Sequence, residues 1–173
     1  AADEAHKPFT DTGSDFISLL KLWDAFGEAR RELSSNKLRQ WCKTRFINFM
    51  RMREWEDLIR QLRRIGHDMG LDGDPARGRL AEADAVAVHK ALLPGLLDHI
   101  GQLDAPADDG KGGARSRKKK AAEYQSARGR RFRIFPGSGL SKRQPQWIVA
   151  GELLETSALY AHTVAGVDPT WIE

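Results

Sequence analysis

The chain has 173 residues, of which 40% are hydrophobic and 30% are charged, and its formal net charge at pH 7 is +4. This length allows one ordinary domain or two small ones with enough apolar surface for a core. No run approaches the roughly 20 apolar residues of a membrane-spanning helix, so no membrane partner is expected. The single cysteine, Cys42, rules out an intrachain disulfide, and with no signal-peptide pattern a cytoplasmic setting is expected. Because the sequence opens on Ala1 without an initiator methionine, we interpret it as a fragment or a processed chain.

Positive charge is concentrated in residues 111–143, which hold twelve Lys or Arg and a single acid, Glu123, while the rest of the chain is net acidic. Such clustering usually marks a phosphate-rich partner, because each neutralised phosphate releases counterions. For the run Lys118, Lys119 and Lys120 the sequence equally allows a flexible solubilising linker.

The first third of the chain is predicted to be helical. Ser14 or Asp15 caps a helix with apolar residues at three- and four-residue spacing. Residues 34–36 interrupt the pattern and offer a second N-cap, and the apolar stripe then continues to Gly66, a predicted C-cap. Arginines lie between the apolar positions, and they could form either a solvated face or a track for nucleic acid.

The middle of the chain alternates loop and helix. Residues 67–79 are a loop by composition, and a helix is predicted from about 81 to 100 with a kink or break at Pro94. His89 lies on the apolar face of this helix and is interpreted as a core residue. Residues 101–122 are polar, Gly-rich and then basic, so they are expected to be disordered.

The last fifty residues change to a β pattern. Three runs are predicted as strands: 132–135, 146–150 and 159–167. Short strands joined by Gly/Pro turns indicate a small antiparallel sheet or barrel. The predicted fold class is therefore α+β, with an N-terminal helical bundle segment followed by a small antiparallel β-barrel.

Three patterns suggest an enzyme but lack the context that catalysis needs. Residues 3–6 spell DEAH without a buried strand before them, and residues 137–142 miss the spacing of a phosphate-binding loop. The five histidines are scattered without metal-ligand spacing. We therefore predict no catalytic residue, no metal ligand and no cofactor in this chain.

Several separated strings, in order, resemble the C-terminal region of bacterial HrpA-type DEAH-box RNA helicases. In the helical part they are residues 9–11 (FTD), 14–23 (SDFISLLKLW), 33–39 (LSSNKLR), 49–55 (FMRMREW) and 61–62 (QL). In the β part they are residues 129–138 (GRRFRIFPGS), 145–157 (PQWIVAGELLETS) and 168–173 (DPTWIE). The segment around 101–122 is longer and more basic than the family pattern suggests.

The resemblance implies a helical ratchet-like segment over residues 1–66, a loop over 67–79 and an oligonucleotide/oligosaccharide-binding (OB) barrel over 80–173. It implies that ATP and magnesium bind in motor domains that are missing here, and that this region lines the channel for single-stranded RNA. The parent protein would be an ATP-dependent RNA helicase, whereas this chain alone would not be an enzyme.

The residues predicted to contact nucleic acid are basic and lie mainly in or near the β part. Alternation along a strand would put Arg131 and Arg133 opposite Phe132 and Ile134. The full set is Arg128, Arg130, Arg131, Arg133, Lys142, Arg143, Lys118, Lys119, Lys120, Arg51 and Arg53. Tyr124, Phe135 or Trp147 could stack on bases, although Trp147 fits a core position better.

Two functions stay open at this point. The first is an accessory region that binds single-stranded RNA and regulates the motor domains. The second is a protein-interaction platform that docks the motor domains or an activator protein. The sequence does not distinguish RNA from DNA. It also suggests no sequence-specific readout, since contacts of this kind are directed at the backbone.

Overall fold

The computed structural model describes residues 1–71, 84–104 and 122–172, and the chain forms two compact units. The helical unit comprises residues 1–9 and 20–82, and the barrel unit comprises residues 10–19 and 83–173. The division between units therefore differs from the predicted boundaries, since residues 10–19 group with the barrel. Each unit is described separately.

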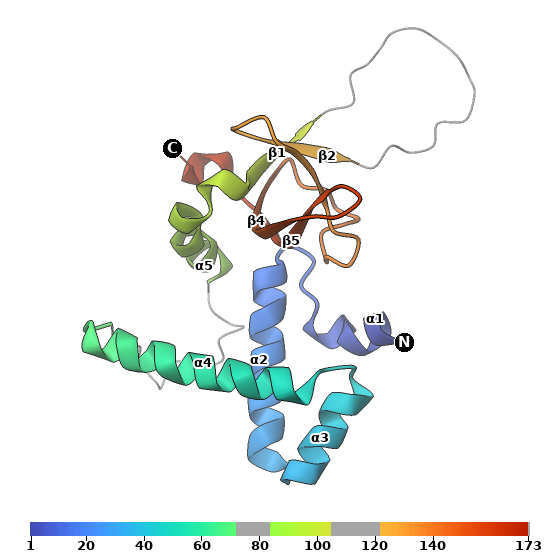
Figure 1. The fold of residues 1–173 in the computed structure, drawn as a ribbon, viewed down its shortest axis with the longest axis vertical. Helices are drawn as coiled ribbons and strands as arrows, with labels where there is room; N and C mark the ends of the chain where they lie inside the picture. The colour runs from blue at the N-terminus through green and yellow to red at the C-terminus, as the bar shows by residue number, and fades with distance from the viewer. Residues whose placement is uncertain (72–83, 105–121, 173) are drawn as a thin grey trace, which may run out of the picture. The chain divides into compact units, whose positions relative to one another are not determined.

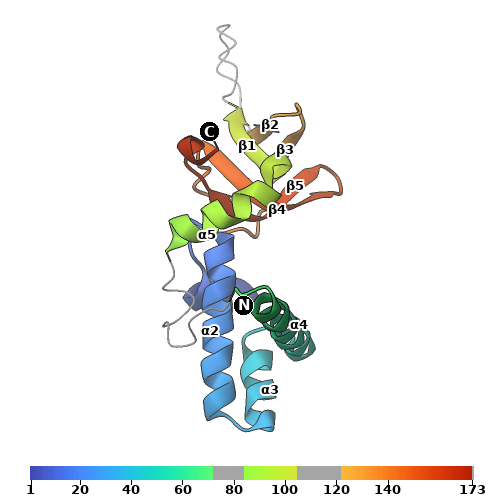
Figure 2. The ribbon, with the colours of Figure 1, turned by 90° about the vertical axis from the view of Figure 1, so that its left-hand side faces the viewer.

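The helical unit is built from short and medium helices (Figure 1). They are α1 (Ala2–His6), a 3-10 turn (Lys7–Phe9), α2 (Asp15–Glu32, of which residues 20–32 belong here), α3 (Ser35–Thr44) and α4 (Phe49–Asp68). Its core brings Phe26, Cys42 and Met52 together, and the partly buried side chains of three tryptophans pack against them. In Figure 2, α3 runs alongside the later part of α2, as the shared core requires.

Local residues set the bounds of α4. Asn48 caps its start by accepting a hydrogen bond from the Arg51 backbone N–H at 3.2 Å. The predicted C-cap at Gly66 is wrong, because the helix continues to Asp68. Gly70, at φ +72°, instead turns the chain, and the Leu71 N–H donates to the Gly66 carbonyl at 2.8 Å.

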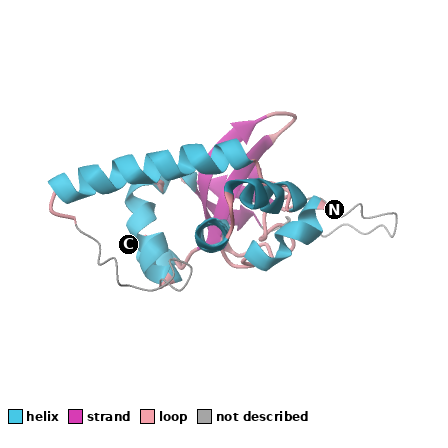
Figure 3. Ribbon diagram, turned by 90° about the horizontal axis from the view of Figure 1, so that it is seen from below, coloured by secondary structure: helices cyan, strands magenta, loops and turns pink. Residues whose placement is uncertain are grey.

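The barrel unit holds all of the strands among the described residues, as the colouring of Figure 3 shows. Its elements are α5 (Ala85–Leu92), 3-10 turns at Leu93–Gly95 and Leu97–His99, β1 (Ile100–Asp104), β2 (Glu123–Ser126), β3 (Arg131–Ile134), β4 (Trp147–Glu155), β5 (Leu159–Gly166) and a 3-10 turn at Pro169–Trp171. The helix predicted to reach residue 100 stops at Leu92, because Pro94 cannot donate a helical hydrogen bond.

The strands close into a barrel in the order β1-β2-β3-β5-β4. The β3–β5 pair is parallel and the other pairs are antiparallel, so the predicted small barrel is confirmed with one parallel seam. Two strands, β1 and β2, were not predicted. Residues 101–104 of the expected disordered insert form part of β1, and residues 105–121 lie outside the described residues.

Tyr124 and Phe132 fill the centre of the barrel, where both are almost fully buried and stack with ring centroids 6.1 Å apart. Gly101 of β1 faces this pair. A Cβ at position 101 would lie 2.4 Å from Phe132 Cζ, so only glycine fits there. Leu140, from the β3–β4 loop, is also fully buried and belongs to the same core.

Residues 13 and 14 extend the sheet beside β5. Ser14 bridges to Ala165, and the Gly166 N–H donates to the Gly13 carbonyl at 3.2 Å. These bonds explain why residues 10–19 group with the barrel. In the part of the chain that the structure describes, no helix is both long and apolar enough to cross a membrane.

Candidate nucleic-acid interface

The predicted basic residues of the barrel fall into two groups, of which the first lies on the outer face of β2 and β3. The predicted alternation is confirmed, because Phe132 is buried while Arg131 and Arg133 point outward. Arg133 donates to Glu123 at 2.6 Å, and Arg131 lies 3.3 Å from an oxygen of Asp104. The acids on β1 and β2 thus balance the charge of these two arginines.

Arg128 belongs to the same balanced group. It lies in the turn after β2 and pairs with Asp98 at 3.2 Å, and both side chains are exposed. An exposed pair of this kind is worth little energetically, so a stronger anion could compete for the arginine.

The second group consists of Arg130, Lys142 and Arg143, which are exposed and have no ion pair with any residue of the described ranges. Arg130 precedes β3, and Lys142 and Arg143 lie in the loop from residue 135 to 146 that joins β3 to β4. We call these three the uncompensated cations. Each of them could bind a phosphate group of a nucleic acid without first breaking an ion pair within the described residues.

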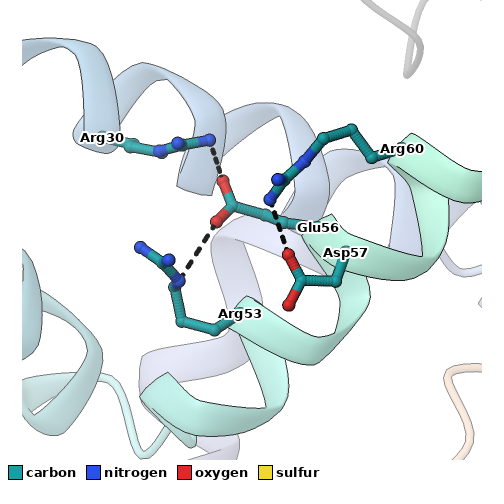
Figure 4. A network of polar contacts seen from close by, with 5 residues as sticks. All are labelled: Arg30, Arg53, Glu56, Asp57 and Arg60. Atoms are coloured by element: carbon teal, nitrogen blue, oxygen red, sulfur yellow. Dashed lines mark hydrogen bonds and ion pairs between the residues drawn. The ribbon is translucent and has the colours of Figure 1, made fainter.

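The remaining predicted residues do not join the barrel groups. Arg51 and Arg53 lie on α4 in the helical unit, where Arg51 pairs with Glu54 at 2.8 Å. Arg53 approaches Glu56, a buried carboxylate that also accepts a hydrogen bond from Arg30 (Figure 4). Lys118, Lys119 and Lys120 lie outside the described residues.

The prediction that Tyr124 could stack on a base is wrong. Tyr124 is fully buried, and its hydroxyl donates to the Pro145 carbonyl at 2.8 Å, so its ring cannot reach a base. Burial also raises the pKa of Tyr124 to about 12. Trp147 is half-buried against a core cluster, as expected. Phe135 is 41% exposed and stacks on His162 at 4.2 Å, which leaves it as the accessible aromatic of the three.

A hollow of about 250 Å³ opens beside Arg133, between the β3–β4 loop and β5. Ser141, Gln144 and Tyr160 contribute polar groups to its lining. It is smaller than the roughly 300–1,000 Å³ of typical small-molecule sites. The hollow therefore suits a side contact of a longer ligand better than an enzyme's substrate pocket.

One pair in the barrel unit has the chemistry of a nucleophile and a base. Ser14 Oγ lies 2.7 Å from His89 Nε2, yet both residues are buried. Ser14 Oγ also accepts the Ile17 N–H at 3.2 Å and so serves as the cap of α2. Burial lowers the pKa of His89, with a smaller opposing effect from Asp11. The predicted role of His89 as a hydrogen-bonded core residue is confirmed.

Residues 3–6, which spell DEAH, lie on the short helix α1 and have no buried residue among them. The described ranges contain no group of three His, Cys, Asp or Glu side chains placed to hold a metal ion.

Comparison with known proteins agrees with this geometry. Residues 88–173 match the family model of the oligonucleotide/oligosaccharide-binding (OB) fold and belong to that family. Over its whole length the chain is 41% identical to the ATP-dependent RNA helicase HrpA of Escherichia coli and 40% identical to its homolog in Haemophilus influenzae. The resemblance to HrpA-type helicases is thereby confirmed. The chain spans 12% of the length of each of these relatives.

Sequence reasoning missed the acids that compensate the outer face. Asp98, Asp104 and Glu123 are isolated in the sequence, and only strand pairing brings them to the arginines. A usable signal was the alternation of residues 123–126, where Glu123 and Gln125 flank the buried Tyr124. It marks a strand whose polar face lies beside that of β3.

Proposed function

We propose that this chain is a non-catalytic accessory region of an ATP-dependent DEAH-box RNA helicase, in which the barrel binds single-stranded RNA and influences the motor domains. The observation that carries the proposal is the group of three uncompensated cations on the loops of an OB barrel. OB folds bind oligonucleotides on the face of their second and third strands and on the β1–β2 and β4–β5 loops, and here the turn before β3 and the β3–β4 loop would add to those contacts. ATP and magnesium would bind in motor domains outside this chain.

The physical basis is electrostatic. Each Lys or Arg that replaces a counterion on a phosphate gains free energy from counterion release, and the gain falls with added salt. Arg130, Lys142 and Arg143 would make such contacts, and Phe135 would offer a ring face to a base. Neither contact reads a base edge, so binding would be tolerant of sequence.

The test is fluorescence anisotropy of a labelled single-stranded RNA of about twelve nucleotides with K142Q/R143Q. The control is K37Q/K43Q, which removes the same charge from exposed positions on α3. We expect the first variant to lose about tenfold in affinity at 50 mM salt and the second to change by less than twofold. Equal losses in both variants would show binding to net charge alone and would sink the proposal.

A second candidate function is a docking platform for the motor domains or an activator. The charge-balanced face of Arg131, Arg133, Asp104 and Glu123 favours it, because a mixed face fits a protein surface better than a phosphate backbone. E123Q tests whether this charge-balanced face itself meets phosphates. Loss of the acid should tighten RNA binding if this face meets phosphates, and should leave it unchanged if the face meets protein.

A further inference from the structure

A single carboxylate links residues 10–19 to the β3–β4 loop. Asp15, the first residue of α2, accepts hydrogen bonds from Ser138 Oγ at 2.5 Å, the Gly139 N–H at 3.0 Å and the Val164 N–H at 2.9 Å. All four residues belong to the barrel unit. Bonds to a charged acceptor are about twice as strong as neutral ones, so this carboxylate is a firm attachment.

The third of these bonds depends on an unusual backbone conformation in β5. Thr163 has φ +55°, a left-handed conformation that is strained for a β-branched residue. It interrupts the pairing with β4, in which Ala150 opposes Val164 and Glu152 opposes His162. Such strain persists where surrounding contacts compensate for it, and the Asp15 bond to the next N–H supplies one.

The loop lies too close to residues 10–15 to be a chance contact. A Cβ at Gly139 would lie 2.6 Å from the Asp11 carbonyl oxygen and 3.3 Å from Thr10 Cγ2. The backbone at residue 139 therefore needs glycine in order to sit against this segment. The hydrogen bonds to Asp15 and the close contact at Gly139 together fix the first half of the β3–β4 loop.

The second half of the loop is held from inside the barrel. Leu140 is fully buried in the core, and the Tyr124 hydroxyl donates to the Pro145 carbonyl at 2.8 Å. Lys142 and Arg143 are the exposed cations between these two attachments. The loop thus presents two cations from a short segment that is fixed on either side.

We infer that Asp15 is a positioning residue for nucleic-acid binding: its carboxylate fixes the β3–β4 loop so that Lys142 and Arg143 meet adjacent phosphates. The inference rests on the proposed function. Its consequence runs against simple electrostatics, because removing a negative charge near a cationic site should strengthen RNA binding. Here the change weakens it, since the two cations lose their fixed placement and must be ordered at the moment of binding.

The experiment compares D15N with D168N in the full chain. Asp168 also caps backbone, at Thr170, so the control makes the same charge change away from the loop. We expect D15N to lose about fivefold to tenfold in RNA affinity and D168N to change by less than twofold. A D15N chain that binds RNA as well as the wild type or better overturns the inference.

A measurement without RNA separates this inference from the proposed function. In ¹⁵N relaxation, we expect the amides of Lys142 and Arg143 to become more mobile in D15N and to stay rigid in D168N. Unchanged loop order in D15N refutes the positioning role even if the chain binds RNA. Should D15N fail to fold, S138A removes one of the three donors to Asp15, together with the bond that the hydroxyl accepts from the Leu140 N–H at 3.1 Å, and the same outcomes apply with a smaller loss of affinity.

Discussion

Substituting Gly101 with alanine tests the packing at the centre of the barrel. The added Cβ would lie 2.4 Å from Phe132 Cζ, 3.2 Å from Phe132 Cε1 and 3.0 Å from Tyr124 Cβ. Neither ring can swing into solvent, because both are buried at 0–1% exposure and stack on each other. Overpacking of this kind costs about 1–3 kcal/mol. For a unit of this size, that corresponds to a fall of roughly 4–20 °C in melting temperature.

Thermal unfolding followed by circular dichroism measures this effect. The matched control is G95A, because a Cβ at position 95 meets no atom within 4 Å and the glycine has no positive φ. We expect G95A to melt within about 2 °C of the wild type, since surface changes of this type are small. Adding F132L to G101A should recover part of the loss by making room. A G101A chain that melts with the wild type would refute the close approach of β1 to the ring pair.

Three further predictions concern individual buried groups and can be measured by urea unfolding. Y124F should cost about 1 kcal/mol, because the Pro145 carbonyl loses its hydroxyl donor; no change would mean that this bond is absent in solution. Because burial lowers the pKa of His89, the unfolded chain binds a proton below about pH 6.5 that the folded chain does not. The free energy of unfolding should therefore decrease as the pH is lowered below 6.5, by at most about 1.4 kcal/mol per pH unit, and H89N should lose this part of the pH dependence. A slope unchanged in H89N would contradict the lowered pKa of a histidine bonded to Ser14. E56Q should destabilise the helical unit by about 1–2 kcal/mol, less than a fully buried pair because its arginine partners are about half exposed, and a neutral result would argue against the network in Figure 4.

Strong local signals in the sequence predicted most of the helical unit and the strands β3, β4 and β5. Helical periodicity and the capping residues near Ser14 and residues 34–36 identified the starts of α2 and α3 to within a residue. The end of α4 was predicted too early, at Gly66, because a glycine inside a helix cannot be told from one just after it in a single sequence. The structure distinguishes them through the left-handed conformation of Gly70.

The missing strands and the charge balance share one physical cause. β1 (IGQLD) and β2 (EYQS) are short and contain few apolar residues, and the polar segment between them in the sequence hides their pairing. The registers that set Asp104 opposite Glu123 and Gln125 opposite Arg131 are long-range facts that no local window contains. For the same reason, the sequence predicted a single basic track from residues 128 to 143. In the structure, some of these cations form ion pairs with acids on neighbouring elements and others form none within the described residues. Asp15 was recognised as a possible cap but not as a contact of residues more than a hundred positions away.

The measurement that tests the central proposal most directly is an NMR titration of the ¹⁵N-labelled chain with an unlabelled single-stranded RNA of about twelve nucleotides. We predict that the largest amide shifts fall on Arg130, Lys142 and Arg143, with a smaller effect at Phe135, and that they diminish between 50 and 200 mM salt. Shifts confined to the helical unit, or none at millimolar RNA, would contradict RNA binding by the barrel.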